Sequence, residues 1–123
     1  MSGRSYLLDT NIVLYLMGGD KVLAEILDDK VPYVSFITEM ELLSARKRAA
    51  KDEKEINAFL ADCTIIEMSR EIKQLAIQIR KTTSLKLPDS IIAATASYFN
   101  ITLLTADTEF NKLKSLSILQ YKP

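Results

Sequence analysis

The chain has 123 residues, of which 48% are hydrophobic and 26% are charged, and its formal net charge is zero. This composition excludes a disordered chain and predicts one globular domain over residues 1–123, long enough to bury a core of its own. No apolar run reaches the roughly 20 residues of a membrane-spanning helix, and no signal peptide opens the chain, so we expect a cytoplasmic protein with no membrane partner.

Two residue types limit the chemistry that this chain can perform. It contains no histidine, which removes the commonest general base, the Ser–His and Cys–His nucleophile pairs and the usual zinc ligands. Its single cysteine, Cys63, cannot form an internal disulfide, which fits a reducing compartment. If the chain is an enzyme, its chemistry therefore depends on carboxylates, whose oxygens suit Mg²⁺ or Mn²⁺.

The first stretch of the chain joins an apolar run to a polar turn and then to a second apolar pattern. Residues 6–9 predict a buried strand, and residues 10–17 predict a short helix that ends before two glycines. In open parallel sheets, functional sites lie at the carboxyl ends of the strands. Asp9, which ends this strand, is therefore the first candidate site residue.

Strands and helices alternate along the rest of the chain. We predict further strands at residues 31–35, 64–67, 102–105 and 116–119. We predict further helices at residues 20–27, 38–49, 52–62, 87–99 and 108–113, and one that Ser69 caps and that carries apolar residues as far as Ile79. Strands separated by helices predict an α/β fold, a three-layer α/β/α sandwich around a parallel sheet.

Four acidic residues are expected at the carboxyl edge of this sheet. Asp9 and Asp107 end strands, whereas Glu41 and Asp89 lie in the first turns of helices that begin at that edge. Two carboxylates about 5 Å apart repel by roughly 3 kcal/mol at an effective dielectric near 20, and a helix cap contributes only about 1 kcal/mol. Four acids at one edge therefore predict a divalent cation that neutralises them.

Each of these acids also has a structural explanation. Asp9 and Asp107 suit helix caps or turns, and Asp89 lies where a helix dipole favours an acid. Thr38 and Glu41 have the spacing of a capping box. In this alternative the chain is a non-enzymatic signalling or binding module whose acids only cap helices.

A basic segment follows the helix predicted at residues 38–49. It contains Arg46, Lys47, Arg48 and Lys51. Cations at the end of a helix complement its dipole, and the same side chains suit contacts with nucleic-acid phosphates. We treat these four residues as candidate nucleic-acid contacts, with solvated helix ends as the alternative.

Four motifs together resemble a known family. They read LLDTNIV near the start, ITEMELL after the second strand, LPDSIIAATA before the fourth strand and LLTADTEF after it begins. In order and spacing they are similar to the PIN-domain ribonucleases, and within these to the VapC toxins of type II toxin–antitoxin pairs. The resemblance implies a five-stranded parallel sheet in the order 3-2-1-4-5 and Mg²⁺- or Mn²⁺-dependent endonuclease cleavage of RNA. It also implies a homodimer and a cognate antitoxin protein that covers the site.

The resemblance assigns roles to individual residues. The family's catalytic and metal-binding acids fall on Asp9, Glu41, Asp89 and Asp107. Its supporting polar residues fall on Asn11, Thr105 and Thr10. From metal chemistry we expect one or two ions to activate a water for attack on the phosphodiester, with Glu41 accepting its proton.

Other proteins of similar topology fit the sequence less well. Haloacid-dehalogenase-like phosphatases have an Asp two residues after the first one, where this chain has Asn11. A receiver-like signalling domain closes its third strand with an Asp, where this chain has Glu67, Met68 and Ser69. A PIN-like RNA-processing nuclease without an antitoxin remains as an alternative to a toxin.

Overall fold

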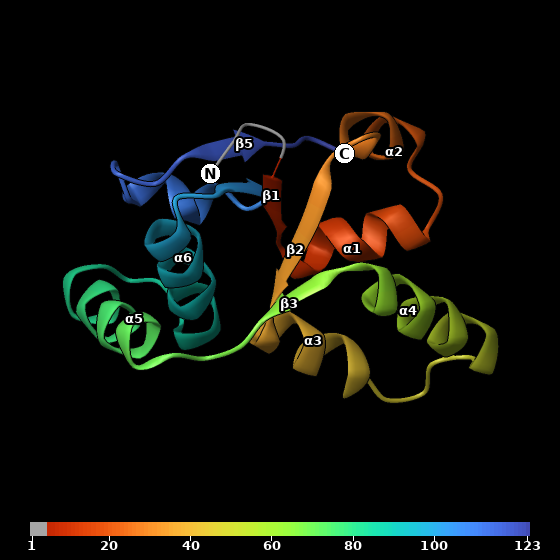
Figure 1. Ribbon diagram of the computed structural model, residues 1–123, viewed down its shortest axis with the longest axis horizontal. Coiled ribbons are helices and arrows are strands. Elements are labelled where there is room, and N and C mark those ends of the chain that lie inside the picture. Colours follow the sequence, from red (N-terminus) through yellow and green to blue (C-terminus); the bar gives the residue numbers. More distant parts are fainter. Residues whose placement is uncertain (1–4) are drawn as a thin grey trace.

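A computed structural model describes residues 5–123 and has a single sheet of five parallel strands at its centre. The strands are β1 (Ser5–Leu8), β2 (Val31–Ser35), β3 (Thr64–Ile66), β4 (Thr102–Thr105) and β5 (Ile118–Gln120), in the order β3-β2-β1-β4-β5. This order confirms the expected topology. Because the first strand is the middle one, the segment that follows it emerges at the centre of the carboxyl edge (Figure 1).

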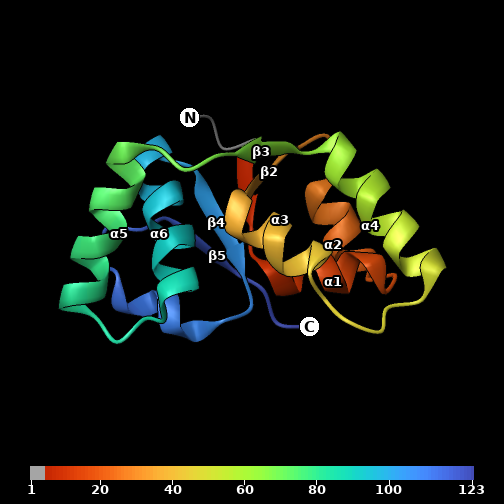
Figure 2. The same ribbon diagram turned by 90° about the horizontal axis from the view of Figure 1, so that it is seen from below.

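Helices cover both faces of the sheet. They are α1 (Thr10–Met17), α2 (Lys21–Leu27), α3 (Phe36–Leu43), α4 (Ala50–Asp62), α5 (Arg70–Thr82), α6 (Leu87–Phe99) and the short 3₁₀ helix η1 (Thr108–Lys112). Figures 1 and 2 show α5 and α6 on one side of the sheet and α1, α2 and α4 on the other. None of the helices within residues 5–123 is long and apolar enough to cross a membrane.

Successive side chains of the central strands β1 and β4 point alternately into two hydrophobic cores, one on each face of the sheet. Leu8 and Leu104 pack with α1, α2 and α4, whereas Leu7 and Leu103 pack with α6 and η1, and all four are fully buried. This period of two, with apolar residues on both faces, is what a parallel strand covered on both sides requires. The two cores fix β1 and β4 side by side, and thereby fix the two loops that leave their carboxyl ends.

Several predicted helix boundaries are confirmed. The Ser69 side chain accepts a hydrogen bond from the Ile72 amide at 3.1 Å and caps α5. Pro88 lies in the first turn of α6, and Asn100 ends that helix in the left-handed conformation at φ 54°. These residues place the start of α6, and with it Asp89, at the carboxyl edge of the sheet.

The prediction for α3 was wrong at both ends. Ser35 caps the helix by accepting from the Ile37 amide at 3.2 Å, so the helix begins before Thr38 and the predicted capping box does not form. The helix ends at Leu43, and residues 44–49 form a loop in which Lys47 has a φ of 58°. Residues 44–49 have a sequence that favours a helix, but tertiary packing overrides this propensity. The chain reverses direction in this loop, and the reversal brings Ile56 of α4 into the core.

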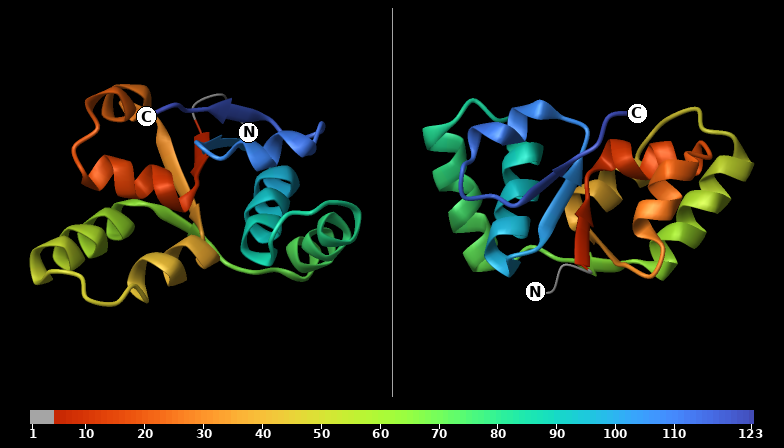
Figure 3. Two further views of the ribbon diagram at one scale, coloured as in Figure 1. Left: turned by 180° about the vertical axis from the view of Figure 1, so that it is seen from behind. Right: turned by 90° about the horizontal axis from the view of Figure 1, so that it is seen from above.

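Smaller differences occur at three strands. β1 ends at Leu8 rather than at residue 9, and β3 ends at Ile66 rather than at residue 67. β5 spans Ile118–Gln120 rather than residues 116–119. After β5 the chain turns toward α2 (Figure 3), where the Tyr121 hydroxyl donates to the carboxylate of Asp20, at 2.8 Å from one oxygen and 2.6 Å from the other. Asp20 also caps α2 by accepting from the Leu23 amide, so this contact ties the last residues to the second helix.

We predict that Phe110→Ala destabilises the protein by about 3–5 kcal/mol, because Phe110 is fully buried against α6 and the cavity left behind cannot be refilled. Urea unfolding monitored by circular dichroism measures the change. Ile77→Ala, at an exposed position of α5, is the control and should change the unfolding free energy by less than about 0.5 kcal/mol. Equal effects of the two substitutions would contradict the assignment of Phe110 to the core.

Candidate active site

The four predicted acids come from four different elements that meet at the carboxyl edge. Asp9 directly follows β1, and Asp107 lies two residues after β4. Asp89 is in the first turn of α6, as expected, whereas Glu41 is in the second turn of α3 because that helix begins earlier than predicted. Because α3 begins where β2 ends, Glu41 still lies on the segment that leaves this edge.

Asp9 is the most constrained of the four. Its side chain is almost fully buried, with 7% of the residue exposed. One carboxylate oxygen accepts from the Thr10 amide at 2.8 Å, and the other accepts from the Thr105 hydroxyl at 2.7 Å. Both oxygens are thus held in place, and each keeps lone pairs for a further partner.

Thr105 connects the two aspartates that follow the central strands. Its hydroxyl donates to Asp9 and accepts from the Asp107 amide at 3.0 Å. The Asp107 carboxylate in turn accepts from the Glu109 amide at 2.9 Å and caps η1. The capping expected for Asp9 and Asp107 is therefore present, and it leaves one Asp107 oxygen without a capping role.

Glu41 is held by hydroxyl groups rather than by a helix cap. Its Oε1 atom accepts from the Thr10 hydroxyl at 2.6 Å, and Thr38, which is fully buried, lies with its Oγ1 atom 3.1 Å from that hydroxyl. Thr10 has one hydroxyl proton, and the charged carboxylate is the stronger acceptor. The Thr10 hydroxyl therefore donates mainly to Glu41, with Thr38 Oγ1 as a second, more distant acceptor, which fixes one carboxylate oxygen and leaves Oε2 without a hydrogen bond among the described residues.

The pKa values of Asp9 and Asp89 respond to the other acids at this edge. Burial raises the pKa of Asp9, the hydrogen bonds from Thr105 and Thr10 counteract it, and the charges of Asp107 and Glu41 add to the rise. Burial, followed by the charges of Asp9, Asp107 and Glu41, raises the pKa of Asp89 from 3.8 to about 6. These charge effects place Glu41 and Asp107 in the neighbourhood of Asp9 and Asp89.

Within residues 5–123, no basic side chain forms an ion pair with any of the four acids. The ion pairs among these residues are Lys30–Asp29 and Lys112–Glu109. Within the same residues, no three carboxylates are already arranged around one ion position. Like charges without a counter-ion turn apart, and rotation of the Asp89, Asp107 and Glu41 side chains is available because none of these three is fully buried.

The donor set fits a hard divalent cation. It consists of carboxylate and hydroxyl oxygens, with no imidazole, and the only cysteine, Cys63, lies at the end of α4. The raised pKa values of Asp9 and Asp89 mean that an uncompensated negative charge at this edge is unfavourable. A bound Mg²⁺ or Mn²⁺ would remove that cost, so the residues present suit the ion that the family resemblance implies.

The other predicted residues lie in different surroundings. Asn11 is exposed on α1, and its side chain has no hydrogen bond to any residue in the described range. Arg46, Lys47 and Arg48 lie in the loop after α3, at the end of that helix remote from β2, and Lys51 lies in the first turn of α4 (Figure 2). Arg48 donates to the Leu42 carbonyl and lines a pocket of about 220 Å³ beside α1 and α4.

One residue beside the acids was missed from sequence. The capping-box spacing predicts Thr38 as a helix cap, and the same spacing of three from Glu41 is the signal that could have placed it beside that acid. Lys86, which the sequence offers with other basic residues as a candidate nucleic-acid contact, lines a pocket with Asp89 and Asp107.

A family comparison agrees with this geometry. The PIN domain model matches residues 6–116, which is most of the chain. The chain belongs to the PIN domain family. This match and the structural neighbours confirm the resemblance to VapC-type PIN domains that the four motifs indicated, and members of the family are nucleases.

Solved structures of similar fold cover nearly the whole chain. A chain from a toxin–antitoxin complex of Klebsiella pneumoniae is 30% identical, with a TM-score of 0.82 over 96% of this chain and 99% of its own. A chain of VapBC2 from Rickettsia felis, bound to a promoter DNA fragment, is 23% identical, with a TM-score of 0.86 over the same shares. A chain of VapBC-1 from nontypeable Haemophilus influenzae is 25% identical, with a TM-score of 0.81 over 94% of this chain and 97% of its own. No curated protein sequence matches the chain at a significant level.

We predict that Asp89→Asn stabilises the metal-free protein. The folded state keeps the Asp89 proton up to about pH 6, whereas the unfolded chain releases it near 3.8, so this group makes folding less favourable as the pH rises between those values. At pH 7 the gain in the variant should be on the order of 1 kcal/mol, because solvent screening reduces the roughly 3 kcal/mol that the full pKa change implies.

Urea unfolding in EDTA, from pH 4 to pH 8, measures this effect. The unfolding free energy of the wild type should fall between pH 4 and pH 6, and that of the variant should fall less. Glu67→Gln, which removes an exposed carboxylate in the loop after β3, is the control and should leave the curve unchanged. A variant less stable than the wild type at pH 7 would mean that Asp89 is not under repulsion.

We also predict that Thr105→Val destabilises the protein by about 1–3 kcal/mol at pH 7, because the buried Asp9 carboxylate loses a hydrogen bond. Thr105→Ser keeps the hydroxyl and should recover most of the loss. The difference between the two variants should shrink at low pH, where Asp9 is protonated and its need for a donor is smaller. Equal stability of the Val and Ser variants at pH 7 would show that this hydrogen bond does not hold Asp9.

Proposed function

We propose that this chain is a Mg²⁺- or Mn²⁺-dependent endoribonuclease and the toxin of a toxin–antitoxin pair, with Asp9, Glu41, Asp89 and Asp107 as its catalytic and metal-binding residues. The observation that carries the proposal is the convergence of these acids at the carboxyl edge, where burial and the neighbouring acids raise the pKa of Asp9 and Asp89 and no basic side chain pairs with the acids within residues 5–123. Membership of a nuclease family supports the same function.

The chain's own residues divide the work of binding and catalysis. Asp9, Asp89 and Asp107 would hold the ion, with Glu41 contributing directly or through water. When bound, the ion lowers the pKa of a water and offsets negative charge on the phosphate. Thr105 and the Thr10 amide keep the Asp9 oxygens oriented for this task, as supporting groups do at metal sites.

Proton transfer is assigned to Glu41. Its Oε1 atom is occupied by the Thr10 hydroxyl, so Oε2 is the atom that can accept a proton from the attacking water. With no histidine in the chain, a carboxylate is the available base at this edge. Asn11 is exposed next to Thr10, and we propose that it orients a water or a ligand from there.

The partners are proposed from the relatives. The Klebsiella pneumoniae match is a toxin–antitoxin complex and the Rickettsia felis match is a VapBC pair, which supports a cognate antitoxin for this chain. A homodimer, an RNA substrate and a cytoplasmic location belong to the same proposal, as does a single nuclease domain over residues 1–123. Arg46, Lys47, Arg48 and Lys51 stay candidate RNA contacts.

The proposal predicts that Asp107→Asn lowers Mn²⁺-dependent cleavage of RNA by at least about 100-fold while the protein stays folded, because the loss of a direct ligand should cost no less than the loss of a supporting residue. A pool of structured RNAs, such as total tRNA, is incubated with protein and Mn²⁺, and fragments are resolved on a gel. EDTA should abolish cleavage by the wild type. Asp62→Asn, on the exposed end of α4, is the control prepared in parallel.

Two results would contradict the proposal. Full activity of the Asp107 variant would remove the site assignment, because cleavage would then not need this carboxylate. A wild-type melting temperature that does not rise with Mn²⁺ would favour the alternative in which the acids only cap helices, since a ligand of the folded state must raise it.

A further inference from the structure

A pocket opens beside two of the four acids. It has a volume of about 300 Å³ and is lined by Ser84, Leu85, Lys86, Asp89, Asp107 and Glu109. Two segments form it: the loop between α5 and α6 with the first turn of α6, and the chain from Asp107 into the start of η1. Lys86 is the one cationic side chain among the described residues that line this pocket.

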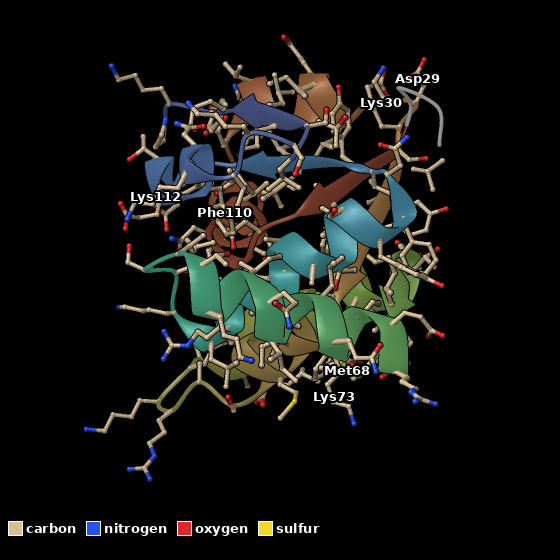
Figure 4. All side chains as sticks on the ribbon, turned by 90° about the vertical axis from the view of Figure 1, so that its left-hand side faces the viewer. Asp29, Lys30, Met68, Lys73, Phe110 and Lys112 are labelled. Atoms are coloured by element: carbon tan, nitrogen blue, oxygen red, sulfur yellow. The ribbon has the colours of Figure 1, made fainter. Side chains whose placement is uncertain are left out.

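A second lysine near the pocket, Lys112, already has an acidic partner. Lys112 projects from the surface of η1, whereas Phe110 of the same short helix points into the core (Figure 4). The Lys112 ammonium forms an ion pair with Glu109 at 3.0 Å and donates to the Ser84 hydroxyl. These contacts join η1 to the loop before α6. They pair the charge of Lys112 with Glu109, which lines the pocket.

Lys86, in contrast, has no acidic partner in an ion pair among the described residues. Its side chain is exposed, and within residues 5–123 its ammonium forms no ion pair. Its charge reaches Asp89, where it opposes the acids and slightly lowers the pKa of that carboxyl. Its three N–H donors are therefore available to an incoming anion.

The backbone that carries Lys86 is held firmly. The preceding residue, Leu85, is buried, and its carbonyl accepts from the Arg80 guanidinium at 2.9 Å. The Lys86 carbonyl accepts from the Ser90 amide at 2.9 Å and from the Ser90 hydroxyl at 3.0 Å. The position of Lys86 relative to Asp89 is thus fixed, and only the flexible side chain has to adapt to a ligand.

We propose that Lys86 binds a backbone phosphate of the nucleic-acid substrate in this pocket, next to the phosphodiester that the acids act on. The inference rests on the proposed nuclease function. A polyanionic strand that approaches four carboxylates is repelled by them, and a free ammonium three residues from Asp89 gives it an attractive contact at the same edge. Lysine, as a compact charge on a flexible stem, suits a phosphate of variable position.

The alternative role for Lys86 is that of a counter-ion for Asp89 alone. The two roles differ in their dependence on salt. A lysine that contacts a phosphate displaces a condensed counter-ion, so its removal lowers the slope of log K against log salt by about 0.7 for a single strand. A lysine that only adjusts Asp89 leaves this slope unchanged.

The test measures binding without cleavage. Glu41→Gln serves as the inactive parent, because it removes the proposed base and lies on a different element from Lys86. A short fluorescein-labelled single-stranded RNA of mixed sequence is titrated by anisotropy in Mg²⁺ at several NaCl concentrations, and a gel confirms that it stays intact. We expect Lys86→Gln in this parent to bind about fivefold more weakly at 0.1 M salt, with a slope smaller by about 0.7.

Two further variants control the result. Lys86→Arg should restore the slope, and Lys73→Gln, an exposed lysine on α5 outside the pocket, should not change it (Figure 4). A parent that binds RNA and keeps its slope in Lys86→Gln would overturn the assignment of Lys86 and leave the proposed function standing. A parent that shows no salt-dependent RNA binding would overturn both.

Discussion

Repulsion among four carboxylates governs the functional end of this protein. The parallel order of the strands brings Asp9 and Asp107 to one edge, and α3 and α6 add Glu41 and Asp89 to it. Burial, and then the charges of the other three acids, raise the pKa of Asp89 to about 6. A fold selected for stability alone would have placed a lysine or an apolar residue here, so the cost indicates a site that is completed by a cation.

The hydroxyl groups around the acids explain how the fold tolerates this repulsion. Thr105 and Thr10 donate to Asp9 and Glu41, and Thr38 supports Thr10 from a fully buried position. They reduce the cost of burying charge without neutralising it, whereas a lysine in the same place would compete with a metal ion. The same contacts limit the freedom of two of the four ligands, which lowers the entropy that ion binding has to overcome.

Sequence patterns predicted most of the fold and the placement of all four acids at one edge of the sheet, because strand alternation, helix caps and turn residues are local signals. They failed where two local signals competed or where tertiary packing decided. Ser35 and Thr38 are both good caps, and only the structure shows that Ser35 is used. The basic residues after Leu43 favour a helix, but the chain reverses there to bury α4. The tie from Lys112 to Ser84 spans 28 residues, and no local pattern encodes it.

The most direct test of the shared metal site is a crystal structure with Mn²⁺, using anomalous scattering at the manganese edge. We expect one or two peaks at the carboxyl edge, within about 2.0–2.2 Å of oxygens from Asp9, Asp89 and Asp107. Peaks at Mn²⁺ saturation that lie only on other carboxylates, with these three side chains turned away from one another, would contradict the claim that a divalent cation unites them.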